Sequence, residues 1–409
     1  MALVLMSRSP SPNPHAPTYD PRKQDLHGYR RIPPDLIQCV GHSGVQAGER
    51  FTVPGFVSDL VIFPHQAFPF YVNSPSLNAI KYLLKQVKSG FPYIVAIPDV
   101  ESDDEDEEED DELLALRSKR GTLVKIGAYA QDSDEACHLD GHAVARVRIH
   151  SVNYTSREYM PSGNLSFVSE VVAEVLSEPI PSNYFRNIFP HYLAIYAANH
   201  PNQVEPWIRA VTNVGPSLVN SCGMMAAQRE LQKMLFKYYP SEKAAFVDNY
   251  NLADKSFWFA QNFPSDSKWR KKLLDEDCPA YRLIMIHKAV ELFKCVSCAN
   301  CGSSLTDPLR DAMVMSTEGS SALYMNPGGH IHDMFFVRRE KEHALVANGH
   351  RHATFSWFEG YSWRCMMCTG CYQHVGWEFT SEVINPPKFI AFTRYAITME
   401  LNPQEEPEL

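Results

Sequence analysis

The chain has 409 residues, of which 44% are hydrophobic, so it is long enough for two or three domains with sizeable cores. The formal net charge of -10 comes mostly from one run, because residues 101–112 contain eleven acidic residues and no basic one. From Cys295 onward there are eight Lys and Arg against thirteen Asp and Glu, which argues against binding to a nucleic-acid backbone.

The first segment, residues 1–49, is rich in Pro and Ser and has seven prolines before Asp35. It lacks apolar periodicity, so we expect a disordered tail. Residues 1–6 are too short for the apolar core of a signal peptide, and no stretch of the chain is apolar and long enough to span a bilayer. These observations predict an intracellular protein with reduced thiols and no membrane association.

Residues 50–180 have the pattern of a mostly-β domain. Strands are expected at 60–64, 68–72, 93–98, 122–130, 143–149 and 165–176. A helix is expected from Ser74, a natural N-cap followed by Pro75, to Gly90. The acidic run 101–112 cannot fold against itself, because like charges repel, and is predicted to be a solvated loop.

Residues 181–292 indicate a helical segment. Apolar spacings of three and four occur in 224–238, 255–261 and 281–294, and prolines separate these stretches. The last helix leads into residues 293–401, which are predicted to form an antiparallel β domain, and residues 402–409 are an acidic tail. The expected fold class is therefore α+β.

Two cysteine pairs of the C-x-x-C type predict one structural zinc site in the last third of the chain. Its expected ligands are Cys298, Cys301, Cys368 and Cys371. Cys295 and Cys365 precede the two pairs at the same spacing and offer alternative pairs. We prefer Cys298, Cys301, Cys368 and Cys371 because a glycine stands beside the second cysteine of each pair and can adopt a positive φ: Gly302 follows Cys301, and Gly370 precedes Cys371. Four free buried cysteines remain the alternative.

Aromatic residues gather around the second cysteine pair. Trp377 and Phe379 are two positions apart and share one face of a strand, while Trp357 and Trp363 flank a turn at Gly360. These side chains predict either a packed aromatic core or the walls of a binding site, and the spacing alone does not distinguish the two.

Residues 60–64, 120–126, 257–274 and 281–283 resemble the N-terminal domain of Lon proteases, over roughly residues 50–292. The chain has no Gly-Lys-Ser/Thr loop to hold phosphates, so the resemblance implies a fold and no ATPase chemistry.

Residues 324–327, 356–363 and 371–379 resemble the thalidomide-binding domain of the cereblon family, whose members also carry a Lon-type domain. The resemblance implies a zinc-pinned β domain of the β-tent type and a non-catalytic function. That function is the substrate-recognition subunit of a cullin-RING E3 ubiquitin ligase. Its expected partners are the propeller adaptor of a cullin-4-type ligase, bound by the helical segment, and proteins with C-terminal cyclic imides or small imides.

By the same resemblance, Trp357, Trp363 and Trp377 form the walls of an imide pocket, Phe379 its back, and Asn326 lies beside it. Phe355 stands where the family has a histidine that meets the polar edge of the imide. Losing one neutral hydrogen bond of about 0.5–1.5 kcal/mol should weaken imide binding up to about tenfold. His350 and His352 could substitute as donors or be ordinary loop residues.

Two other functions are alternatives to a ubiquitin-ligase subunit. The zinc-pinned fold also resembles methionine-R-sulfoxide reductases, but Ala396 stands at the position of their nucleophilic cysteine and no cysteine follows Cys371. A zinc-ribbon interaction module is the second alternative, and the acidic balance opposes a version that binds nucleic acid.

Overall fold

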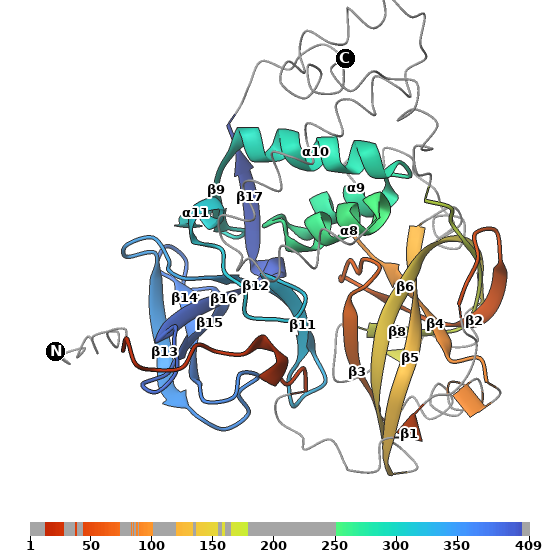
Figure 1. Ribbon diagram of the computed structural model, residues 1–409, viewed down its shortest axis with the longest axis horizontal. Coiled ribbons are helices and arrows are strands. Elements are labelled where there is room, and N and C mark those ends of the chain that lie inside the picture. The colour runs from red at the N-terminus through yellow and green to blue at the C-terminus, as the bar shows by residue number, and fades with distance from the viewer. Residues whose placement is uncertain are drawn as a thin grey trace, which may run out of the picture.

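The computed structural model of the chain describes residues 13–27, 37–38, 44–73, 90–100, 120–133, 136–153, 158–159, 165–178 and 251–402, with a few positions between 83 and 88. A mixed β sheet, a group of helices and a second β-rich part lie side by side in Figure 1. The expected solvated loop 101–112, the helix at 224–238, most of the helix at 74–90 and the tail 403–409 lie outside the described residues.

The N-terminal sheet has eight strands in the order β1-β5-β4-β2-β8-β6-β3, with β7 paired to β8. They are β1 (Ile37–Gln38), β2 (Arg50–Ser58), β3 (Ala67–Asn73), β4 (Tyr93–Pro98), β5 (Arg120–Ser133), β6 (Ala136–Asn153), β7 (Glu158–Tyr159) and β8 (Leu165–Val175). β2 and β4 pair in parallel and the other strand pairs are antiparallel. β4 is buried along its whole length, because Val and Ile pack on both faces of this inner strand.

Residues 60–64 are not a strand, contrary to the prediction from their apolar run. They form an irregular loop that ends in a turn, where His65 has a φ of 74°. Burial explains the apolar character instead, since Leu60 packs in the core of the N-terminal sheet while Phe63 packs among the helices. An apolar run shows that a segment is buried, and it does not by itself distinguish a strand from a buried loop.

Among the described residues after the sheet, which begin again at 251, three helices precede the C-terminal domain: α8 (Leu252–Asn262), α9 (Ser267–Asp275) and α10 (Pro279–Leu292). The side chains of Asn251 and Asp266 cap α8 and α9 by accepting a backbone N–H each, and Pro279 begins α10. None of the helices in the described ranges is long and apolar enough to cross a membrane.

The C-terminal domain, residues 293–402, contains two antiparallel sheets. Their strand orders are β10-β9-β17 and β11-β12-β16-β15-β14-β13. The elements are β9 (Phe293–Cys298), β10 (Ser304–Thr306), α11 (Pro308–Asp311), β11 (Ser321–Met325), β12 (Ile331–Val337), β13 (Leu345–His352), β14 (Ser362–Cys368), β15 (His374–Thr380), β16 (Lys388–Thr393), η2 (Arg394–Ala396) and β17 (Ile397–Leu401). The predicted α+β class and the antiparallel β domain are confirmed.

Residues 13–27 contradict the prediction that the whole segment 1–49 is disordered. They run along the C-terminal domain, with a short turn of helix, η1 (Pro21–Lys23) (Figure 1). Tyr19 is 7% exposed and packs edge-on against the rings of Phe358 and Tyr361. The Asp25 N–H donates to the carbonyl of Trp357 at 2.9 Å. A polar, proline-rich composition therefore does not prevent ordering where an aromatic side chain packs into the core of a domain and backbone hydrogen bonds hold the segment.

Glu378 of β15 is a buried carboxylate that three cations surround. Its oxygens lie 2.8 Å from Arg351, 2.6 Å from Arg364 and 3.2 Å from Lys388. Burial alone would raise the pKa of Glu378, but Lys388 and then Arg364 outweigh it and leave this pKa below its ordinary value. The group therefore stabilises the folded domain in its charged form.

Candidate metal centre and aromatic site

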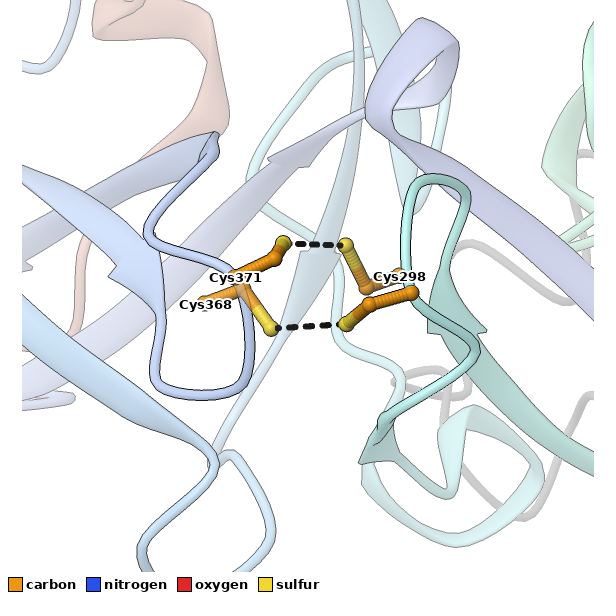
Figure 2. Close-up of side chains that lie close together, drawn as sticks. Cys298, Cys368 and Cys371 are labelled. Carbon is orange, nitrogen blue, oxygen red and sulfur yellow. Dashed lines mark hydrogen bonds between the residues drawn. The ribbon is translucent and has the colours of Figure 1, made fainter.

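The four predicted cysteine ligands lie together at one end of the C-terminal domain. The Sγ atoms of Cys298 and Cys371 are 3.6 Å apart, as are those of Cys301 and Cys368 (Figure 2). All four sulfur atoms lie within 4.8 Å of one another. A tetrahedral ion with metal–sulfur bonds of about 2.3 Å requires sulfur–sulfur separations of about 3.8 Å. The arrangement therefore fits a metal ion held by four thiolates.

Two backbone turns, one after β9 and one after β14, position these thiols. β9 ends at Cys298, and the following turn closes with hydrogen bonds from the Cys298 N–H to the Ser303 carbonyl and from the Gly302 N–H to the Cys298 carbonyl. Gly302 has a φ of 71°, which is the conformation expected for it. The first turn thus needs its glycine for the backbone.

The second turn follows β14 and differs from the expectation. Its positive φ, 59°, belongs to Tyr372 and not to Gly370. Gly370 is required for another reason, because a Cβ there would lie 2.5 Å from the Ser303 hydroxyl and 3.1 Å from the Cys301 sulfur. Glycine permits the two turns to approach each other closely.

The two spare cysteines lie outside the cluster. Cys295 is buried on β9, with its sulfur 3.5 Å from the Ser297 hydroxyl and 3.6 Å from a Glu400 oxygen. Cys365 lies opposite Trp377 in the pairing of β14 with β15. Neither thiol belongs to the four-sulfur group, because each lies three positions before a ligand of that group and side chains three positions apart on a strand point to opposite faces.

The four thiols differ in environment. A hydrogen bond with the Ser303 side chain, together with its backbone, lowers the pKa of Cys301 to about 6, whereas burial raises the pKa of Cys298 to about 12. Four sulfur donors in a tetrahedral arrangement suit zinc or iron and exclude the hard cations magnesium and calcium. The Ser303 hydroxyl lies 3.2 Å from the Cys301 sulfur, which is the kind of outer contact that orients a metal ligand.

The aromatic residues come together in the C-terminal domain, but not as three equivalent walls. The rings of Trp357 and Trp377 meet at 87° with centroids 5.5 Å apart, and they are 6% and 7% exposed. Phe379 is fully buried behind them, 6.4 Å from Trp357. This perpendicular pair belongs to the main core of the domain.

Trp363 stands apart from that pair. It is half-buried on β14, opposite Phe379 of β15, and no ring contact joins it to the other two tryptophans within the described chain. Its indole N–H donates to the carbonyl of Thr354 at 2.8 Å. His352 lies against it, with ring centroids 5.2 Å apart, whereas His350 is exposed on β13.

Phe355 lies in the loop between β13 and β14. It is 55% exposed and has a φ of 61°. The structure thus places the predicted set in three positions: a buried pair, a half-buried Trp363 and an exposed Phe355.

Asn326 begins the turn that joins β11 to β12. Its side-chain oxygen accepts from the backbone N–H groups of Gly328 and His330, and its Nδ2 lies 3.2 Å from Nε2 of His332. His332 in turn packs edge-on against Trp377, with centroids 4.8 Å apart. Asn326 therefore shapes the turn and connects to the aromatic pair through His332.

Two histidines that no sequence pattern indicates lie next to Trp377. His332 is 7% exposed, and burial lowers its pKa to about 3, with smaller effects from His330 and His374. His374 packs on the other side of Trp377, with centroids 4.7 Å apart. Simple strand alternation puts His374 and Trp377 on opposite faces, but a register shift between Met366 and Met367 brings them together.

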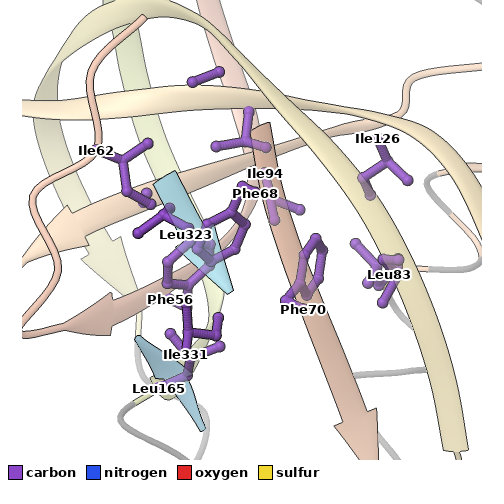
Figure 3. Close-up of a cluster of buried hydrophobic side chains, with 14 of the residues drawn as sticks. Phe56, Ile62, Phe68, Phe70, Leu83, Ile94, Ile126, Leu165, Leu323 and Ile331 are labelled. Atoms are coloured by element: carbon purple, nitrogen blue, oxygen red, sulfur yellow. The ribbon is translucent and has the colours of Figure 1, made fainter. Parts of the chain in front are cut away.

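The hairpin that carries Asn326 and His332 also joins the two parts of the chain. Leu323 of β11 and Ile331 of β12 lie among Phe56, Phe68 and other buried residues of the N-terminal sheet (Figure 3). Phe56 and Phe68 stack with centroids 4.9 Å apart. One end of the aromatic site is thereby attached to the core of the other domain.

One protein family and several known proteins are similar to this chain. The model of the ATP-dependent protease La (LON) substrate-binding domain family matches residues 52–291. Among curated proteins, cereblon of Drosophila persimilis is 37% identical over 124 residues, covering 30% of this chain and 20% of that protein. Cereblon of Drosophila melanogaster is 36% identical over the same length, covering 30% and 21%. The chain thus matches about a fifth of the length of these relatives.

Among solved structures, the Lon N-terminal domain protein of Xanthomonas campestris aligns with 58% of this chain and 96% of its own, at 14% identity and a TM-score of 0.30. The Lon N-terminal domain of the Mycobacterium avium complex aligns with 58% and 97%, at 14% identity and a TM-score of 0.31. The predicted resemblance to cereblon is confirmed by the curated relatives. The family model covers more than half of the residues of this chain, so the chain belongs to the LON substrate-binding domain family.

Proposed function

We propose that this chain is the substrate-recognition subunit of a cullin-RING E3 ubiquitin ligase and that its C-terminal domain captures cyclic imides. The imide is either a small molecule or the cyclised C-terminus of a target protein. The observation that supports the proposal most directly is the perpendicular pair of Trp357 and Trp377, with Trp363 on the neighbouring strand and Phe379 behind. Similarity to cereblons points to the same function.

The physical case for an imide rests on shape and polarity. A flat, mostly apolar ring gains free energy when indole faces remove it from water. Its imide edge still needs donors and acceptors, and backbone groups of the loop around Trp357 can provide them. Trp363 is the accessible member of the three, so a ligand would enter beside it and contact the buried pair from that side.

The four cysteines hold one structural zinc ion in this proposal. Zinc needs no open coordination position for such a function, and four thiolates suit it well. The ion would connect the end of β9 to the end of β14 and so keep the strand that carries Trp363 in place. It supplies folding free energy and no catalysis.

Ubiquitin transfer belongs to other subunits in this proposal, and the chain itself is not an enzyme. Residues 185–250, for which the sequence predicts helices, dock the propeller adaptor of a cullin-4-type ligase. The assembly works in the cytoplasm and nucleus, without nucleic acid or membrane as a partner. Deleting residues 185–250 should abolish co-purification of the adaptor from cell extract while the zinc content stays unchanged. If the intact chain does not co-purify the adaptor, the ligase part of the proposal fails and the imide part remains.

The imide part is tested by titrating zinc-loaded protein with glutarimide and following tryptophan fluorescence. Binding should quench the emission, and Trp363→Ala should remove the response. Trp269→Phe is the matched control, because Trp269 lies on α9 and packs against Phe263 far from the site. No quenching at millimolar imide would leave the tryptophans with only a packing function.

A further inference from the structure

Phe355 combines two unfavourable features in one residue. Its φ of 61° lies in the left-handed region, which bulky side chains rarely adopt. Its ring is 55% exposed, and in the part of the chain that the structure describes no aromatic ring packs against it. Such local strain concentrates at functional sites.

The backbone on both sides of Phe355 is held in place. The carbonyl of Thr354 accepts the Trp363 indole N–H at 2.8 Å. On the other side, the Ser356 hydroxyl donates to the carbonyl of Phe358 at 3.0 Å, and the carbonyl of Trp357 accepts from Asp25. The loop that carries Phe355 is thus tied to Trp363 through the backbone of the neighbouring Thr354, and little backbone entropy is lost when a ligand contacts the loop.

We infer that Phe355 is a specificity-determining residue that selects imides carrying a large apolar group next to the imide ring. In a protein terminus, this group is the side chain immediately before the cyclised residue. A phenyl ring has no hydrogen-bonding group for the imide edge, so its contribution is contact with apolar surface. An aromatic partner would cover the exposed face of Phe355 and gain from ring contact. This inference rests on the proposed function of the site.

Two synthetic peptides that end in an aminoglutarimide test it, one with Phe and one with Gly before the imide. Their affinities for the full zinc-loaded chain are measured by calorimetry. The Phe peptide should bind about three- to tenfold more tightly than the Gly peptide. In Phe355→Ala this ratio should fall to about one.

Tyr372→Ala is the matched control, because Tyr372 is also aromatic, 71% exposed and left-handed, at a φ of 59°, but lies in the second cysteine turn. With its zinc content verified, it should keep the wild-type ratio. Phe355→His should tighten binding of the Gly peptide, since it adds a donor, and should narrow the ratio. Equal binding of the two peptides, or a ratio that survives Phe355→Ala, overturns the inference and leaves the proposed function standing. If neither peptide binds, both are overturned.

Discussion

Replacing Cys301 by Ser should remove the metal and unfold the C-terminal domain. Cys301 and Cys368 are 67 positions apart in the chain, and their sulfur atoms lie 3.6 Å from each other. A cross-link that closes a loop of about 70 residues restricts the unfolded chain by about 4 kcal/mol in the chain-entropy treatment. Because metal binding is also coupled to folding, this figure is a lower bound for the loss.

The expected change is large enough to measure by heating. For a domain of about 110 residues, each kcal/mol shifts the Tm by about 4–8 °C, so the Tm of the C-terminal domain should fall by about 15–30 °C. Circular dichroism follows the unfolding, and elemental analysis should count one zinc per wild-type chain and almost none in Cys301→Ser.

Cys295→Ser and Cys365→Ser are the matched controls, because they make the same chemical change at thiols outside the four-sulfur group. Both should keep one zinc per chain, and the free energy of unfolding should fall by only about 1 kcal/mol, as for a small buried apolar side chain. Full zinc content and an unchanged Tm in Cys301→Ser would refute the reasoning. Loss of zinc in either control would show that the ligand pairs were chosen wrongly.

Two further predictions concern the stability of the C-terminal domain. The pKa of Glu378 is lower in the folded domain than in the unfolded chain. The ionised carboxylate therefore adds to the free energy of unfolding at pH values above the unfolded pKa of about 4.3, and this contribution is lost as the pH falls through the lower folded value. Urea unfolding between pH 7 and pH 3 should show this decrease in the free energy of unfolding. Glu378→Gln should abolish this part of the pH dependence, whereas Glu382→Gln, at an exposed position, should leave it unchanged. Tyr19→Ala should lower the unfolding free energy of the C-terminal domain by about 2–4 kcal/mol, since Tyr19 is 7% exposed against Phe358 and Tyr361. An unchanged urea midpoint would mean that residues 13–27 lie on the domain without stabilising it.

Features that depend on neighbouring residues could be predicted from the sequence. The strand at 93–98 was predicted at its observed bounds, because a run of Val and Ile in a buried strand needs no distant information. The four clustered cysteines could be selected because a C-x-x-C turn directs both thiols to one side, whatever the rest of the fold does. Both the strand and the cysteine pairs are determined by the spacing of residues that lie within a few positions of one another.

Tertiary structure decided the features that depend on contacts between distant segments. The rings of His332 and His374 reach Trp377 because β12 and β15 lie on either side of β16 in one sheet and because the pairing of β14 with β15 shifts its register. Tyr19 is buried because its ring packs against Phe358 and Tyr361 and its backbone is hydrogen-bonded to Asn385, all more than 300 positions away in the chain. The exposure of Phe355 could not be read from its apolar character, since a backbone held by hydrogen bonds to Trp363 and to residues 24–27 turns its ring outward. Local pattern determines which residues tend to be buried, and only the packing of distant segments determines which of them remain available for binding.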